Sequence, residues 1–190
     1  MVCIKAGGWM QQLWAIFFML LLSSFSAWAQ TCGNAIPLSS PDSRYIDGGN
    51  GTVIDLHTGL MWQQCAVGLS GADCTEGAVE TFRWDKALQY SDNINATSGF
   101  ANYFNWHLPN IKELLSLVED ACIDPAVNLN YFPNTTSANF WTSTPYMGLP
   151  GAFFYIPPPE TWYVNFSGGY SGSINRDTDG LSVRLVRFIE

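Results

Sequence analysis

Asp55 and His57 are residues whose types and spacing could do acid–base chemistry. They lie two positions apart, and on a strand such residues share one face. A carboxylate that orients an imidazole is half of a hydrolase triad, and a hydroxyl such as that of Ser143 could be the nucleophile. The sequence has no G-x-S-x-G, no H-E-x-x-H and no phosphate-cradling glycine loop. We therefore expect His57 to make a turn hydrogen bond, and we expect no catalytic residues and no enzyme activity.

A second segment could bind a metal ion. Asn175, Asp177 and Asp179 carry side-chain oxygens at alternate positions and Gly180 stands sixth, as at the start of a calcium loop. The twelfth position is Val186, where such a loop needs an acidic ligand. A hairpin turn explains the same residues, because Asn, Asp and Gly favour turns. Calcium ligation and a plain turn both stay open, and we expect no other cofactor.

Aromatic residues of the kind that bind ligands gather in two late segments rich in Gly and Pro, 144–160 and 167–180. Flat aromatic rings suit pyranose sugars. The tryptophans at 62, 106 and 141 could serve the same purpose, but we expect these large side chains in the core. The predicted ligand-binding residues are Tyr146, Phe154, Tyr155, Tyr170 and Arg176.

Alternating and β-branched patterns predict short strands, and helical periodicity predicts two helices. One helix covers 81–94, with Thr81 as its cap. The other follows Asn110, with Glu113 placed for a capping box and an apolar stripe that reaches Val118. The predicted strands are 44–48, 51–55, 60–63, 140–144, 153–156, 162–166, 171–174 and 183–188. The pattern indicates one α+β domain of mostly antiparallel strands with long loops.

The N-terminus has the features of a secretory signal. Lys5 is the only charge before Asp42, an apolar run covers 13–22, and Ala27 and Ala29 form an A-x-A cleavage pattern. We predict a signal peptide over residues 1–29 and a single domain over 30–190. The alternative is an uncleaved anchor, although the run is shorter than the roughly 20 residues of a comfortable membrane span. After cleavage we expect no membrane span.

Net charge limits the partners. The mature chain would keep 7 basic and 16 acidic side chains, a net charge of −9. An acidic exterior repels nucleic acid and anionic lipid over the Debye length. The same charge weakens the case for binding sulfated polysaccharide. We therefore expect no nucleic-acid partner.

Four cysteines stay in the mature chain. An even number in a secreted protein predicts two disulfides, and four cysteines allow three pairings. We favour Cys65–Cys74, because the glycine-containing segment between them closes a small loop easily, which leaves Cys32–Cys122. Zinc is the rival, but the chain has no C-x-x-C spacing and both histidines lie far away in sequence.

Several motifs together resemble the Lcl C-terminal domain family over residues 45–188. They are T-G-L-M-W at 58–62, W-x-L-P-x-x-x-E-L at 106–114, F-W-T-S-T at 140–144 and V-R-L-V-R at 183–187. The resemblance implies a core similar to C-type-lectin-like domains, with variable binding loops, in extracellular bacterial proteins. One named member of the family acts in adhesion to glycosaminoglycans. This chain departs from the family at His107, where Arg is usual, and no collagen-like repeat precedes the domain.

From the motifs and the charge we expect a secreted, periplasmic or cell-surface protein. Its expected function is non-catalytic binding or adhesion, with an extracellular glycan, or a cell-surface protein, as partner. One alternative is a structural subunit of a cell-surface assembly that forms a homo-oligomer. Another is an enzyme on a lectin-like scaffold that uses cysteines and a metal. Free thiols at Cys65 and Cys74 would favour the enzyme.

Overall fold

The computed structural model describes residues 29–147 and 159–189. These ranges form a single small α+β domain of short strands with two α-helices, and no helix within them is long and apolar enough to cross a membrane. The elements are β1 (Thr31–Cys32), a 3-10 turn (Asp42–Arg44), β2 (Tyr45–Asp47), β3 (Thr52–Asp55), β4 (Leu60–Gln63), β5 (Leu69–Ser70), β6 (Glu76–Gly77), β7 (Thr81–Phe82), α2 (Trp84–Ala96), α3 (Ile111–Leu115), β8 (Cys122–Ile123), β9 (Asn139–Tyr146), β10 (Glu160–Asn165), β11 (Tyr170–Asn175), β12 (Leu181–Ser182) and β13 (Val186–Phe188).

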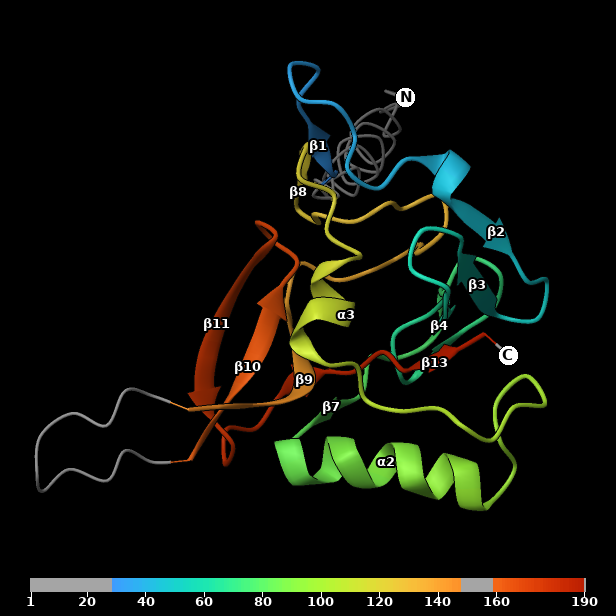
Figure 1. Ribbon diagram of the computed structural model, residues 1–190, viewed down its shortest axis with the longest axis vertical. Coiled ribbons are helices and arrows are strands. Elements are labelled where there is room, and N and C mark those ends of the chain that lie inside the picture. Colours follow the sequence, from blue (N-terminus) through green and yellow to red (C-terminus); the bar gives the residue numbers. More distant parts are fainter. Residues whose placement is uncertain (1–28, 148–158, 190) are drawn as a thin grey trace, which may run out of the picture.

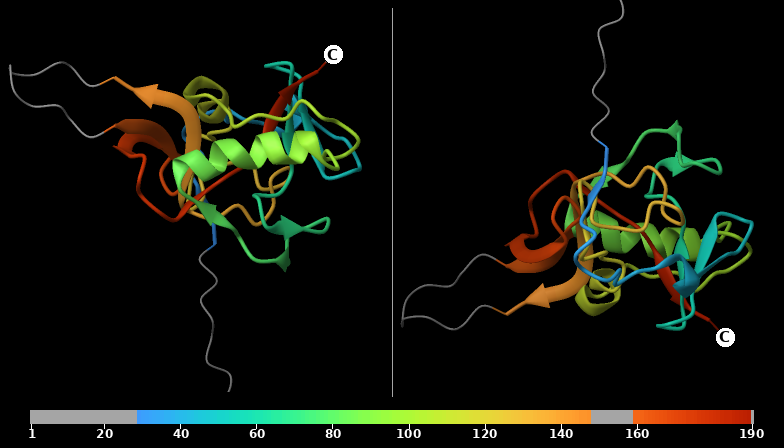
Figure 2. Two further views of the ribbon diagram at one scale, coloured as in Figure 1. Left: turned by 90° about the horizontal axis from the view of Figure 1, so that it is seen from below. Right: turned by 90° about the horizontal axis from the view of Figure 1, so that it is seen from above.

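Two sheets make up the body of the domain (Figure 1). The larger has the strand order β11-β10-β9-β12-β7, and the smaller has the order β13-β4-β3-β2. The pairs are antiparallel except for one parallel bridge between Ser182 of β12 and Phe140 of β9. The helix α3 lies between the sheets, while α2 runs along one side of both and faces the viewer in the left view of Figure 2. The α+β class predicted from the sequence is therefore confirmed.

The strands predicted at 44–48, 51–55, 60–63, 140–144, 162–166 and 171–174 are found, most of them with shifted ends. β2 and β3 pair around the turn at 48–51, where the Gly48 N–H donates to the Thr52 carbonyl at 2.8 Å. The strand predicted at 183–188 is present only in its last part, as β13 (Val186–Phe188), and residues 183–185 connect it to β12 (Leu181–Ser182), which precedes the predicted range. β12 belongs to the larger sheet and β13 to the smaller, so the chain leaves one sheet and joins the other within this segment. The strand predicted at 153–156 lies outside the described residues.

The start predicted for the first helix is wrong. Thr81 is not a cap, because its backbone pairs with Ser182 between β7 and β12, and α2 begins only at Trp84. Arg83 occupies the N-cap position and makes no side-chain capping bond. A pairing partner far away in sequence therefore overrides the local capping preference of threonine.

The start predicted for the second helix is confirmed. The Asn110 side chain accepts from the backbone of Glu113 at 3.0 Å, and the Glu113 carboxylate accepts from the backbone of Asn110 at 2.7 Å, which completes a capping box. The helix α3 is short, Ile111–Leu115, and Val118 lies beyond its end. Val118 is nevertheless buried, so the apolar stripe serves the core as expected.

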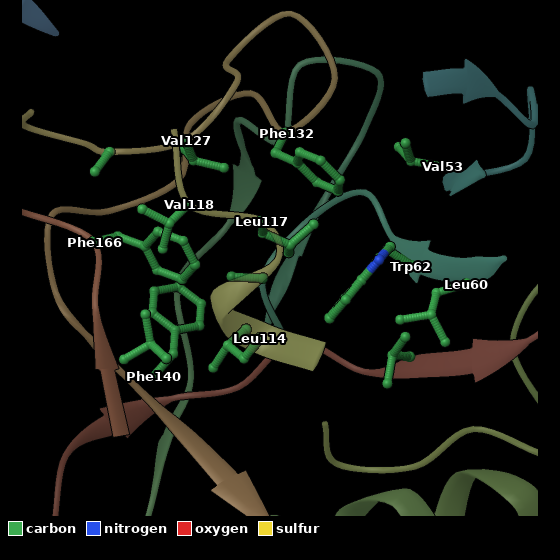
Figure 3. Close-up of a cluster of buried hydrophobic side chains, with 14 of the residues drawn as sticks. Val53, Leu60, Trp62, Leu114, Leu117, Val118, Val127, Phe132, Phe140 and Phe166 are labelled. Carbon is green, nitrogen blue, oxygen red and sulfur yellow. The ribbon is translucent and has the colours of Figure 1, made fainter. Parts of the chain in front are cut away.

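Two hydrophobic clusters fill the domain. The first joins the sheets around α3, where Leu114 and Leu117 lie between Phe140 of the larger sheet and Trp62 of the smaller (Figure 3). The second lies under α2 and includes Trp106 and Trp141, whose indole N–H groups donate to the backbone carbonyls of Phe100 and Phe82. The three tryptophans expected in the core are 0 to 2 % exposed, which confirms that expectation. The members labelled in Figure 3 are Val53, Leu60, Trp62, Leu114, Leu117, Val118, Val127, Phe132, Phe140 and Phe166.

Both predicted disulfides are present, Cys65–Cys74 and Cys32–Cys122. The second ties the start of the described chain to β8, as the backbone pairing of β1 with β8 also does. Beside it the buried Glu119 carboxylate accepts hydrogen bonds from the backbone N–H groups of Ser39, Ser40 and Ala121. The N-terminal segment is thus held by a covalent bridge and a carboxylate whose two oxygens are already engaged.

Candidate functional site

A pocket of about 530 Å³ lies between three parts of the chain. They are the β2–β3 turn at 47–51, the segment 63–72 that leads into the disulfide loop, and the side of α2 that carries Tyr90 and Ile94. The ring of Phe100 completes the lining. The volume is within the range of pockets that take small ligands.

The β2–β3 turn forms the first wall. Gly49 and Gly51 both have positive φ, at 71° and 79°, which glycine adopts without strain. A Cβ at Gly51 would lie 3.3 Å from Cζ of Phe100, so the backbone of the turn is in close contact with the ring. The turn is further fixed by Asp47, whose carboxylate accepts from the Gly49 N–H at 2.8 Å. Asp47 and Asn50 are exposed at the pocket and offer oxygen and amide groups to a ligand.

The disulfide loop forms the second wall. Residues 68–72 line the pocket and lie between Cys65 and Cys74, and the short pair β5–β6 projects from the body in both views of Figure 2. Gly68 has φ 91°, and a Cβ there would lie 2.2 Å from the Ala78 carbonyl oxygen. The bridge and this close backbone approach together keep the loop beside the pocket.

The side of α2 forms the third wall. Tyr90 and Ile94 are one helical turn apart and therefore lie on the same face of α2. The Tyr90 ring packs on Phe82, with ring centroids 5.3 Å apart. Burial, and to a smaller extent the charge of Glu80, raises the pKa of the Tyr90 phenol, which is therefore a neutral hydrogen-bond donor at neutral pH.

The lining defines what the pocket can do. Amides of Asn50, Gln63 and Gln64, the Tyr90 phenol and glycine backbone supply hydrogen bonds, while Ile94 and Phe100 supply apolar surface. Asp47 is the only lining side chain with a formal charge at neutral pH, and Cys65 is bridged. Such groups bind and orient a polar ligand by hydrogen bonding and stacking. The sequence signals for this site were the glycine clusters at 48–51 and 68–71 and the one-turn spacing of Tyr90 and Ile94, and none of them was interpreted as a pocket.

Of the described predicted ligand-binding residues, Tyr146 and Arg176 lie at the Glu160 end of β10, and Tyr170 lies at the other end. Tyr146 lies at the end of β9 and packs edge-on against Trp162, with centroids 5.1 Å apart. Tyr170 pairs with Asn165 at the opposite end of the β10–β11 ladder, and its side chain is exposed. Both are described residues, whereas Phe154 and Tyr155 lie outside the described ranges.

Arg176, the fifth predicted residue, is held by neighbours. Its guanidinium lies 4.4 Å from the ring centroid of Trp84, and its Nε donates to the Glu160 carbonyl at 3.1 Å. This arrangement places it beside α2, near the end of β11 remote from Tyr170. The ligand-binding role of all five residues stays a prediction.

The residues of the calcium hypothesis form a turn. The Asn175 side chain accepts from the Asp177 N–H at 2.8 Å, and the Thr178 N–H donates to the Asn175 carbonyl at 3.0 Å. The Asp177 carboxylate pairs with Arg83. A cation at Asp177 and Asp179 would have to displace this arginine. Among the described residues no group of three or more His, Cys, Asp and Glu is arranged to hold a metal, and calcium ligation stays a hypothesis.

Asp55 and His57 do not form a catalytic pair in this arrangement. The Asp55 side chain is fully buried and binds the Arg44 guanidinium, with Nε at 2.8 Å from Oδ1. His57 donates its backbone N–H to the same carboxylate at 2.9 Å, as expected for a turn, while its side chain is exposed. Burial alone would raise the pKa of Asp55, but the bonds from Arg44 and the turn hold that pKa below its usual value.

His107 faces a carboxylate. Its Nε2 lies 3.3 Å from Oε2 of Glu113, and its backbone pairs with Val186 of β13. Burial would raise the pKa of Glu113, but the bonds from His107 and from the Asn110 backbone lower it. An arginine at position 107 would face the same Glu113 carboxylate. The residue at this position therefore pairs with Glu113 through its side chain and with Val186 through its backbone.

A family model described as the Lcl C-terminal domain matches residues 51–187. This range contains Cys65, Cys74 and Cys122 and most of the pocket lining, including Tyr90 and Phe100. No curated protein matches the chain.

Proposed function

We propose that this chain, which belongs to the Lcl C-terminal domain family, is a secreted or surface-exposed, non-catalytic binding module whose ligand is a carbohydrate. The observation that carries the proposal is the pocket between the β2–β3 turn, the disulfide loop and α2. The two disulfides of the domain are consistent with an oxidising, extracytoplasmic space. The lectin-like character of the fold is part of the proposal.

The lining supports a sugar as ligand. Saccharides present hydroxyl groups around an apolar ring face, so they need amides and carbonyls for the edge and an aromatic or aliphatic surface for the face. Gln64 and Asn50 supply the first kind of contact, and Phe100 and Ile94 supply the second.

Charge selects among sugars. Asp47 is the only charged lining side chain, and the mature chain would carry a net charge of −9. Sulfated and uronic-acid polymers would be repelled from such a surface. The proposed ligand is therefore a neutral saccharide, in contrast to the glycosaminoglycan adhesion associated with one named member of the family.

A glycan array followed by calorimetric titration tests the proposal. We expect the mature protein to bind a neutral oligosaccharide and to ignore heparin. Gln64→Ala and Tyr90→Phe each remove one hydrogen-bonding group at the pocket and should weaken binding about 3- to 10-fold. Tyr170→Ala, an exposed tyrosine remote from the pocket, is the matched control and should leave affinity unchanged.

The same titrations separate the pocket from the loops. Loss of affinity in Tyr170→Ala with unchanged binding in Gln64→Ala would move the site to segments 144–160 and 167–180. Binding to heparin alone would contradict the assignment of a neutral ligand.

A second candidate function is self-association within a cell-surface assembly. One observation favours it: β11 is an edge strand of the larger sheet, and its six residues, Tyr170–Asn175, include no proline and no charge. Edge strands of natural proteins usually carry a proline or a charged residue, because an unprotected edge pairs with another chain. Light scattering on the mature protein tests this proposal. A discrete oligomer that the Ser173→Lys substitution dissociates would support it. A monomer at high protein concentration would contradict it.

A further inference from the structure

Arg184 lies in the interior, in the segment between β12 and β13. Its side chain is 1 % exposed, and its Cζ atom lies 4.8 Å from the ring centroid of Phe132 and 5.9 Å from that of Phe140. Both rings belong to the cluster that joins the two sheets (Figure 3). One guanidinium nitrogen, Nη2, donates to Oγ1 of Thr135 at 2.8 Å.

The other guanidinium nitrogens have no partner. Nε and Nη1 of Arg184 are buried and make no hydrogen bond to any described residue, and the same is true of Oγ1 of Thr136, the neighbour of Thr135. Guanidinium nitrogens only donate, and a hydroxyl can donate. The unsatisfied donors thus belong to Arg184 and to the residue that follows Thr135, its hydrogen-bond partner.

The charge of Arg184 is also unbalanced. Among the described residues no carboxylate forms an ion pair with it; the described ion pairs use Arg44, Arg83, Lys86 and His107. Burial lowers the pKa of Arg184 to about 9, so the side chain is still protonated at neutral pH. A buried cation without a counter-charge is strongly destabilising, and an isolated water molecule would satisfy a donor without balancing the charge.

We propose that Arg184, together with the hydroxyl of Thr136, binds a small monovalent anion of the size of chloride inside the core. The anion would accept from Nε or from Nη1, whose N–H groups lie on different edges of the planar guanidinium, and from the threonine hydroxyl, and it would neutralise the guanidinium. The flanking rings of Phe132 and Phe140 are both fully buried, so the proposed site is closed to solvent, and we propose a small anion for that reason. This site is separate from the pocket, because none of its residues lines that pocket.

Crystallography with bromide tests the proposal directly. The mature protein is refolded and crystallised in sodium bromide, and anomalous data are collected at the bromine absorption edge. We expect an anomalous peak within hydrogen-bonding range of Nε or Nη1 of Arg184. Ordered water without anomalous signal at that position, or a carboxylate in contact with the guanidinium, would overturn the proposal.

Thermal unfolding gives an independent measurement. Chloride is raised from 1 to 100 mM while sodium gluconate, whose anion is too bulky for the site, keeps the ionic strength constant. We expect the Tm of the unaltered protein to rise by about 4 °C. Thr136→Val, which retains the guanidinium, should reduce the rise, and Arg184→Met should abolish it.

Arg176→Met is the matched control, because it removes an arginine that stacks on Trp84 outside the proposed site. It should keep the full chloride response. Should Arg184→Met fail to fold, Thr136→Val and the bromide data still decide the matter. An equal response to chloride and gluconate in the unaltered protein would count against an anion site.

Discussion

The backbone N–H of Gln64 donates to the carbonyl of Gly51 at 2.9 Å. This bond continues the β3–β4 ladder by one step beyond the pair Thr52–Gln63. It also joins two walls of the pocket, because Gly51 belongs to the β2–β3 turn and Gln64 begins the segment that leads to Cys65. The pocket is therefore a direct extension of the smaller sheet, and its shape depends on the backbone at Gly51.

Gly51→Ala should reduce both stability and binding. The residue has φ 79°, which costs an L-residue about 1–2 kcal/mol, and the new methyl group would press on Phe100 at 3.3 Å. Gly49→Ala is the control, since it has φ 71° and no atom within 4 Å of its Cβ. Urea unfolding should show a similar backbone cost in both variants, and sugar titration should show weaker binding only in Gly51→Ala. Equal affinities in the two variants would mean that Phe100 is not part of the binding surface.

The two disulfides should have different roles. Removing Cys32–Cys122, which spans 90 residues, should cost about 4.5 kcal/mol of unfolding free energy, and removing Cys65–Cys74, which spans 9, about 2.5 kcal/mol. The shorter bridge lies at the pocket, because Cys65 and residues 68–72 of its loop line it, whereas neither Cys32 nor Cys122 does. We therefore expect Cys65→Ser/Cys74→Ser to lose affinity for the sugar while it remains folded. Cys32→Ser/Cys122→Ser should be the less stable variant yet keep its affinity at low temperature. Urea denaturation and sugar titration of both variants measure this. Loss of affinity in Cys32→Ser/Cys122→Ser, with unchanged affinity in Cys65→Ser/Cys74→Ser, would contradict the prediction.

Local signals in the sequence were sufficient where the interaction itself is local. The capping box of Asn110 and Glu113 and the short disulfide loop each involve residues close in sequence, and both were predicted. Thr81 was misassigned because its partner, Ser182, comes from the far end of the chain. The pocket was not predicted for the same reason. Gly51 and Tyr90 are far apart in sequence, and they line one pocket only because the smaller sheet and α2 pack together.

The hydrogen bonds that Asp55 accepts from Arg44 and from the turn make stability depend on pH, because they outweigh the effect of burial on its pKa. Its folded-state pKa lies below the value of about 3.9 for an unfolded aspartate. The ionised carboxylate therefore stabilises the fold above that value, and the contribution is lost as pH falls through the lower folded-state pKa. Asp55→Asn should cost about 3–5 kcal/mol at neutral pH, because Arg44 would be left without its counter-charge.

Chemical denaturation between pH 7 and pH 2 measures this contribution. The unaltered protein should lose stability steeply in acid, and Asp55→Asn should show a flatter curve. Asp92→Asn, which removes an exposed carboxylate of α2, is the control and should follow the unaltered protein. A parallel acid transition in Asp55→Asn and the unaltered protein would assign the pH dependence to other carboxylates.

The capping box of α3 gives a final measurable effect. Asn110→Ala removes the side chain that accepts from the backbone of Lys112 at 2.9 Å and of Glu113 at 3.0 Å, and it should cost about 1 kcal/mol. Asn110→Ser is the matched control, because serine caps helices almost as well, and it should cost little. The helix α3 places Leu114 between the two sheets, so the loss should appear in the global urea transition, not as local fraying. Hydrogen exchange that reports opening of α3 alone, with an unchanged global midpoint, would show that the helix is not coupled to the core.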